Sequence, residues 1–209
     1  MHDIRFLNES GTVTPSASNL HNYMLDTCAV NAIVKNISDL DLLKLTTAIG
    51  YKYYATDVQF WELHGFGAKT FYHDYFAAEQ YKSTKRLQWL NQKRPLFAQV
   101  FESLSVQRVS YIVTSGATSN WTLGDNVRFF DDSKMSSILF SNLYKMTTNS
   151  KAYQHDAIIA ESAMENNCIL VTTDGELITE VEKLFPGRAI SYNDFLEAAL
   201  KQLDMRDNE

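Results

Sequence analysis

The chain has 209 residues, of which 45% are apolar, 12% aromatic and 21% charged, and its formal net charge at pH 7 is −6. This apolar fraction excludes an extended disordered chain, and no apolar run approaches the roughly 20 residues that cross a bilayer. The N-terminus has neither a basic start nor an apolar core, so we expect no secretion signal and a cytoplasmic protein. Two cysteines, Cys28 and Cys168, cannot make a disulfide scaffold, and neither has a metal-type CxxC neighbour.

The charge is unevenly distributed along the chain. Residues 69–108 carry seven basic and three acidic side chains, whereas residues 151–209 carry five basic and twelve acidic ones. The basic middle has two interpretations. It is either a solvated helical face or an electrostatic footprint for a phosphate backbone.

The predicted elements alternate between strands and helices. Residues 1–20 are polar and weakly patterned, which predicts a loose arm, and Thr56 and Gln59 have the spacing of a capping box that begins a short helix. Residues 69–105 predict two long helices broken near Pro95. We predict strands at 23–25, 51–55, 109–114, 168–172 and 189–190, and further helices at 28–37, 38–49, 133–146, 157–166, 176–185 and from 193. This alternation predicts an α/β fold with a parallel sheet between helices.

Four acidic residues occupy related positions in this pattern. Asp26 ends the first strand, Asp174 follows the fourth, Asp156 opens the helix before the fourth, and Glu62 lies on the helix after the second. Sites in open parallel sheets form outside the carboxyl ends of the strands. Four carboxylates there would repel one another unless a cation neutralises them, and oxygen ligands suit Mg²⁺ or Mn²⁺. Such an ion supports phosphodiester hydrolysis.

Each acid also has a purely structural interpretation. Asp26 and Asp174 could cap the helices that follow them, Asp156 could be a first-turn acid favoured by the helix dipole, and Glu62 could be a surface acid. A cysteine nucleophile at Cys28 is not expected, because no base lies near it in the sequence.

Four segments together resemble a known family. They are residues 23–27 (YMLDT), residues 56–63 (TDVQFWEL), residues 155–160 (HDAIIA) with Ala163, and residues 169–174 (ILVTTD). At these residues the chain is similar to the PIN-domain family of metal-dependent nucleases, with all four segments in the family's order. The resemblance covers most of residues 22–66 and 151–195.

The resemblance implies one PIN-like domain over residues 1–209, a three-layer α/β/α sandwich with a central, mostly parallel sheet. It implies an endoribonuclease similar to VapC-like toxins, with one or two Mg²⁺ or Mn²⁺ ions, so an antitoxin protein and a second copy of the chain are candidate partners. The implied catalytic and metal-binding acids are Asp26, Glu62, Asp156 and Asp174, with Thr27 and Thr172 as supporting hydroxyls.

Two neighbours of these acids have other interpretations. Glu176 could be a further acid, although its spacing from Thr173 fits a capping box, which we favour. His155 more often serves as a local structural partner in such a position, so it stays outside the metal set.

Residues 66–150 lie largely outside the family pattern, and about 69–108 form a basic helical insertion. Lys82, Lys85, Arg86, Lys93 and Arg94 are candidate RNA contacts there. Tyr81 and Trp89 could stack on bases or belong to the core of a helical hairpin. The rival to a nuclease is a non-catalytic RNA- or protein-binding protein on the same scaffold. A DNA-directed nuclease is a further option, because the metal chemistry does not distinguish sugars.

Overall fold

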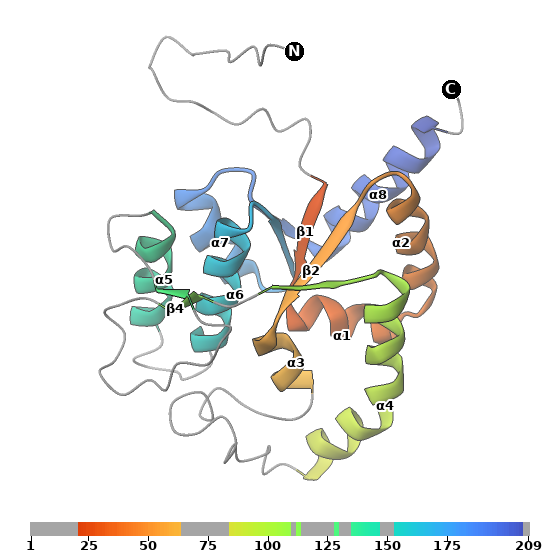
Figure 1. The fold of residues 1–209 in the computed structure, drawn as a ribbon, viewed down its shortest axis with the longest axis horizontal. Coiled ribbons are helices and arrows are strands. Elements are labelled where there is room, and N and C mark those ends of the chain that lie inside the picture. Colours follow the sequence, from red (N-terminus) through yellow and green to blue (C-terminus); the bar gives the residue numbers. More distant parts are fainter. Residues whose placement is uncertain are drawn as a thin grey trace.

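The computed structural model describes residues 21–63, 84–109, 112–113, 128–129, 135–146 and 153–206 (Figure 1). The predicted arm at 1–20, the first part of the predicted helical insertion at 69–83 and the predicted loop around 115–126 lie outside these residues. Within the described segments, no helix is both long enough and apolar enough to cross a membrane.

A five-stranded parallel sheet forms the centre of the fold. Its strands follow the spatial order β3 (Gln107–Val109), β2 (Lys52–Thr56), β1 (Asn22–Leu25), β6 (Ile169–Thr172) and β7 (Ala189–Ser191). Every neighbouring pair is parallel. Two short strands, β4 (Ile112–Val113) and β5 (Arg128–Phe129), pair with each other in a separate ribbon.

Helices cover both faces of this sheet (Figure 1). One face carries α1 (Thr27–Lys35), α2 (Ser38–Ala48), α4 (Thr84–Ser103) and α8 (Tyr192–Arg206), and the other carries α5 (Met135–Met146), α6 (Tyr153–Glu165) and α7 (Gly175–Leu184). Successive residues of β1 alternate between the layers: Tyr23 and Leu25 enter the first core, and Met24 enters the second. Because both faces of the sheet are buried, its central strands consist mostly of consecutive apolar residues. The predicted three-layer α/β/α sandwich is confirmed.

The predicted break near Pro95 is wrong, because α4 runs through it. Pro95 is exposed, while Leu90, Phe97, Val100 and Leu104 are buried. These four side chains form one packing face that spans the proline. Burial of that face holds both halves of the helix in line despite the lost backbone donor.

The strand predicted at 109–114 corresponds to two shorter strands, β3 and β4. The sheet strand β3 starts at Gln107 and ends at Val109, where it pairs with Thr56, the last residue of β2. Beyond this point β2 has turned into α3 (Asp57–Leu63), so no partner remains for a longer strand. Ile112 and Val113 pair instead with β5.

The helix predicted over 157–166 begins earlier, at Tyr153. Asp156 therefore lies in its first turn rather than directly before the helix.

Candidate active site

The site lies where the sheet reverses its strand order. From β1 the chain adds β2 and β3 on one side, and later adds β6 and β7 on the other. A crevice forms outside the carboxyl ends of strands at such a switch point. The backbone of Asp26 marks this place, because its N–H donates to the carbonyl of Val171 at 3.0 Å, one residue past the end of β1.

Asp26 is buried at this edge, with 4% of its surface exposed. Its Oδ1 caps α1 by accepting from the backbone N–H of Thr27 at 2.6 Å, so the capping interpretation is correct for this oxygen. Its Oδ2 accepts from the hydroxyl of Thr172 at 2.7 Å and from the thiol of Cys28 at 2.8 Å. Burial raises the pKa of Asp26, and the charge of Glu62 adds to that rise.

Glu62 is brought to the same edge by the start of α3. The predicted capping box is present, because Oε1 of Gln59 accepts from the backbone N–H of Thr56 at 2.9 Å. The amide of Gln59 also donates to the carbonyl of Leu25 at 3.0 Å, which fixes α3 against the end of β1. Gln59 is fully buried, and sequence reasoning assigned it only the cap.

Both carboxylate oxygens of Glu62 have donors. The hydroxyl of Thr27 donates to Oε2, and Nδ1 of His155 lies 2.7 Å from Oε1. The side chain of Glu62 is only 17% exposed. The surface-acid interpretation of Glu62 is therefore wrong.

Asp156 experiences the charges of the other three acids. Burial is the largest cause that raises its pKa to about 8, and the charges of Asp26, Glu62 and Asp174 each raise it further. An acid stabilised only by the positive end of its helix would have a lowered pKa. The structure thus brings the four predicted acids into one electrostatic neighbourhood.

Asp174 caps α7, as its structural interpretation predicted. Its Oδ1 accepts from the backbone N–H groups of Glu176 at 2.9 Å and Leu177 at 3.1 Å. The capping box favoured for Thr173 and Glu176 is wrong, because the N-cap is Asp174 and α7 starts one residue later.

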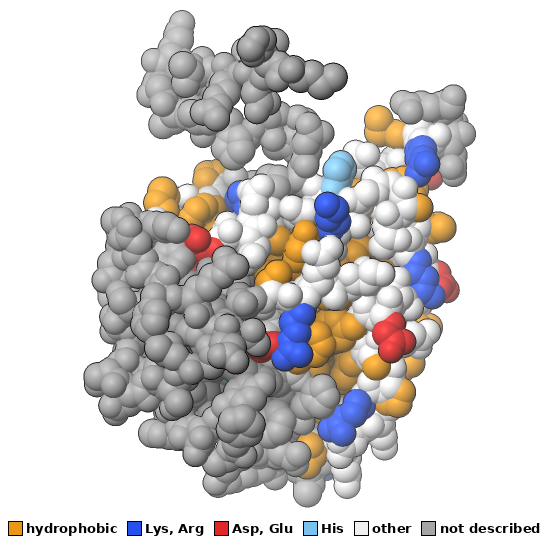
Figure 2. All heavy atoms as spheres, viewed as in Figure 1, with side chains coloured by type: hydrophobic (Ala, Val, Ile, Leu, Met, Phe, Trp, Pro, Cys, Tyr) orange, Lys and Arg blue, Asp and Glu red, His pale blue; other side chains and the backbone are white. Residues whose placement is uncertain are grey.

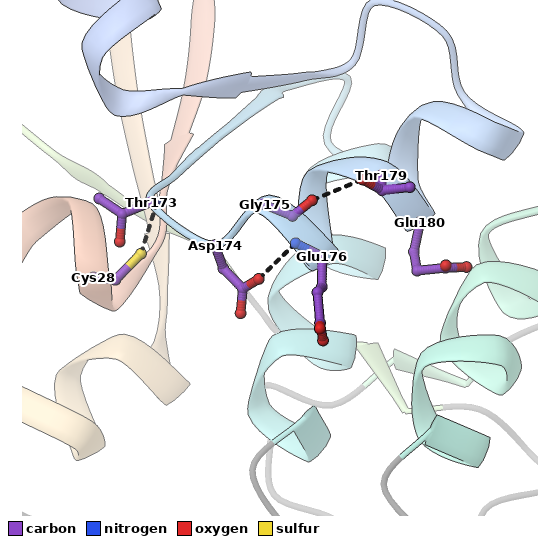
Figure 3. A pocket seen from close by; sticks show the side chains of 7 residues that line it. All are labelled: Cys28, Thr173, Asp174, Gly175, Glu176, Thr179 and Glu180. Atoms are coloured by element: carbon purple, nitrogen blue, oxygen red, sulfur yellow. Dashed lines mark hydrogen bonds between the residues drawn. The ribbon is translucent and has the colours of Figure 1, made fainter.

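An open depression runs from the start of α1 along α7 (Figure 3). Its lining residues are Cys28, Thr173, Asp174, Gly175, Glu176, Thr179 and Glu180. Glu176 and Glu180 thus extend the acidic character of the site along α7, beside Asp174. The depression gives the carboxylate of Asp174 access from outside.

Cys28 packs within this network and stays a thiol. Its Sγ lies 3.1 Å from the hydroxyl of Thr172 and accepts from the backbone N–H of Thr173 at 3.0 Å (Figure 3). Burial and the charge of Asp26 raise the pKa of Cys28 to about 12. A protonated thiol is a poor nucleophile, in agreement with the sequence prediction.

The donor chemistry of the site fits a hard divalent cation. Four carboxylates with neighbouring hydroxyls are the oxygen ligands that Mg²⁺ and Mn²⁺ prefer, and burial, together with the charges of the other three acids, raises the pKa of Asp156. Across the described segments, however, no three His, Cys, Asp or Glu side chains are grouped closely enough to hold an ion as they stand.

The candidate RNA contacts are only partly described. Lys82 lies outside the described residues, as does the side chain of Arg86. Lys85 and Arg94 are exposed on α4, and Lys93 is half-buried. In the part of the chain that is coloured in Figure 2, basic side chains lie apart from one another on the face shown.

Of the two aromatic residues considered for base stacking, the structure describes Trp89 but not Tyr81. Trp89 packs against the core beside α1, with its ring centroid 5.9 Å from that of Phe97. The core interpretation therefore holds for Trp89. Tyr81 lies outside the described residues.

The sequence matches no protein-family model and no curated protein. Several solved structures resemble the fold at low sequence identity, among them the following three. PAE2754 from Pyrobaculum aerophilum is 14% identical with a TM-score of 0.45, covering 90% of this chain and 99% of that one. DNA-bound VapBC from Salmonella typhimurium is 15% identical with a TM-score of 0.42, covering 82% and 98%.

VapBC2 from Rickettsia felis, bound to a promoter DNA fragment, is 15% identical with a TM-score of 0.38, covering 81% and 98%. We draw nothing about chemistry from likenesses this distant. The parallel sheet between two helical layers agrees with the α/β/α sandwich that the motifs predict.

Proposed function

We propose that the chain is an endoribonuclease that uses Mg²⁺ or Mn²⁺ held by Asp26, Glu62, Asp156 and Asp174. The observation that supports this proposal is that the charges of Asp26, Glu62 and Asp174, which come from separate elements, each raise the pKa of Asp156 near the switch point of the sheet. Proteins seldom bring four acids together without a cation, because their repulsion destabilises the fold. The family resemblance of the four segments supports the same assignment.

The surrounding residues would hold the acids in place for this task. Thr172 donates to Asp26, and its Oγ1 accepts from the backbone N–H of Asp174 at 3.1 Å, so one hydroxyl links the two strand-end acids. Thr27 links Asp26 to Glu62 through its backbone and its hydroxyl. The chemistry that a divalent ion supplies here is activation of a water molecule and neutralisation of charge on the phosphate.

We further propose RNA as the substrate and an antitoxin protein as a partner, with a second copy of the chain as another. The basic residues of α4 would contact the RNA backbone through Lys85, Lys93 and Arg94, with Lys82 and Arg86 beside them in the sequence. The net charge of −6 does not oppose this, because the four acids account for −4 before any ion binds.

The decisive variant is Asp174→Asn. Asparagine caps a helix as well as aspartate does, so α7 keeps its bonds to Oδ1 while the site loses one charge. Asp41→Asn is the matched control, because Asp41 is exposed on α2, where it pairs with the nearby Lys44 at 3.0 Å. Both proteins should fold like the wild type by circular dichroism.

The assay is cleavage of a mixed RNA pool with Mg²⁺, with Mn²⁺ and with EDTA. We expect the wild type and Asp41→Asn to cleave only with metal, and Asp174→Asn to lose at least about 100-fold in rate. Cleavage in EDTA, or full activity of Asp174→Asn, would refute the proposed roles. RNA binding that EDTA leaves unchanged, without cleavage with either ion, would favour the non-catalytic rival, and preferential cleavage of DNA would correct the substrate.

A further inference from the structure

The imidazole of His155 contacts the acid site from α6. Its side chain is 1% exposed, and Nδ1 lies 2.7 Å from Oε1 of Glu62, a residue 93 positions away in the sequence. An ionised carboxylate can only accept hydrogen bonds. When Glu62 is a carboxylate, as a ligand of a cation must be, Nδ1 of His155 is the donor of this contact.

This contact completes the restraint of Glu62. The Thr27 hydroxyl donates to the other oxygen, so the two ends of the carboxylate are fixed from two different helices, α1 and α6. A carboxylate has about four lone-pair positions. Two donors therefore fix the plane of the group and still leave acceptor positions for a cation.

The position of His155 in the sequence gives this contact its significance. Asp156 directly follows it, so the first turn of α6 supplies both an acid of the site and the donor that orients a second acid from α3. Movement of α6 relative to α3 would displace both acids together. Ligating carboxylates in metal sites are commonly oriented by outer hydrogen bonds of this kind, and loss of such a bond typically weakens metal affinity or activity 10- to 100-fold.

We propose that His155 is a positioning residue that orients Glu62 for the divalent ion. This inference rests on the proposed function, since it needs an ion at the acid site. His155 acts through Glu62 and makes no contact with the reacting atoms. The competing interpretation is that His155 only fills space between α3 and α6.

Three variants separate these interpretations. His155→Phe keeps a ring of similar size without the N–H donor, and His155→Asn restores a side-chain N–H donor on a smaller side chain. Ser162→Ala is the control: Ser162 is fully buried on the same helix, its Oγ has no hydrogen-bond partner among the described residues, and it is not one of the site residues.

The readout is the Kd for Mn²⁺, measured by isothermal titration calorimetry on the full chain without RNA. We expect His155→Phe to weaken Mn²⁺ binding about 10- to 100-fold. His155→Asn should recover most of this loss, and Ser162→Ala should bind like the wild type. Equal affinity of His155→Phe and the wild type would overturn the inference. So would a loss in His155→Asn as large as that in His155→Phe, because it would indicate packing alone.

A double-mutant cycle with Glu62→Gln tests whether His155 acts through Glu62. We expect His155→Phe to add little loss in the Glu62→Gln background, whereas independent losses would contradict the inference. If His155→Phe does not fold, His155→Leu takes its place in the cycle. A wild-type chain that binds no Mn²⁺ would overturn the proposed function as well, whereas wild-type binding that the histidine variants leave unchanged would overturn this inference alone.

Discussion

Replacement of Asp156 by asparagine should stabilise the metal-free chain. The ordinary pKa of 3.8 rises to about 8 at this position, because the carboxyl is buried and three other acids surround it. The folded state therefore binds a proton that the unfolded state has already released between these two pH values. Ionised Asp156 thus opposes folding, and an asparagine of the same shape carries no such charge.

The size and pH range of the effect follow from this difference. The cost is absent well below pH 4, grows as the pH rises from about 4 to 8, and is constant above pH 8. At about 1.36 kcal/mol per pKa unit its upper limit at pH 8 is about 5 kcal/mol. Water at the partly exposed carboxylate screens some of this cost, so we expect a gain of about 2 kcal/mol, or roughly 4–8 °C in Tm. At pH 5 the gain should fall to about a third of that value.

Thermal unfolding followed by circular dichroism measures these changes. In EDTA at pH 8, Asp156→Asn should melt above the wild type, whereas Asp41→Asn, which loses an exposed first-turn acid and its pair with Lys44, should not. With excess Mn²⁺ the difference in Tm between Asp156→Asn and the wild type should shrink or change sign. The reason is that an ion that binds only the folded wild type stabilises it in proportion to ln(1 + [L]/Kd). A lower Tm for Asp156→Asn in EDTA at pH 8, or an equal gain at pH 5, would refute the electrostatic account.

Two further predictions concern residues away from the acids. Replacing the two exposed basic residues Lys85 and Arg94 with alanine should weaken RNA binding. The slope of log K against log salt concentration should become shallower by about 1.4, because each contact with a single-strand phosphate contributes about 0.7. Binding curves between 50 and 200 mM KCl measure this slope, and an unchanged slope would show that α4 does not contact the RNA. Glu161 is fully buried, and within the described segments neither of its carboxylate oxygens has a hydrogen-bond partner. Burial, aided by the charge of Glu165, raises the pKa of Glu161 to about 9. Glu161→Met should therefore stabilise the chain by about 1–3 kcal/mol at pH 8 and less near pH 5, as urea unfolding would show, and a loss of stability would reveal a role for this carboxylate.

The sequence predicts the fold well where burial is two-sided. Residues 23–25 of β1 and 169–171 of β6 form uninterrupted apolar runs because both faces of the sheet are covered, and this pattern is visible locally. The prediction of a helix break at Pro95 was wrong because local rules disfavour proline inside a helix, whereas the buried face of α4 continues across it. The prediction of a strand beyond Val109 was wrong because the length of β3 depends on where its partner strand β2 ends.

In the candidate site, too, features set by neighbouring residues could be predicted from the sequence, whereas contacts between residues far apart in the sequence could not. Asp26 and Asp174 were predictable, because strand ends and helix starts are local signals. The partners that orient the acids were not. The contact from Gln59 to Leu25 joins residues 34 positions apart, and the contact from His155 to Glu62 joins residues 93 apart. The only sequence signal for the histidine was its place directly before Asp156.

The four acids differ in how helix dipoles support them. Asp26 and Asp174 are N-caps, and Asp156 lies in the first turn of α6, so the positive ends of three helices face these carboxylates. Each such interaction contributes about 0.3–1 kcal/mol.

At Asp156 the dipole of α6 offsets about 0.3–1 kcal/mol, which is less than the roughly 2 kcal/mol expected for ionising this buried carboxyl. The helix dipole therefore reduces the cost of ionised Asp156 without removing it. Glu62, the sixth residue of α3, lies beyond the first turn that a dipole favours, and it is the acid that receives donors from Thr27 and His155. The sandwich thus stabilises each carboxylate by the means that its position allows, and the charge that remains is what a divalent ion would neutralise.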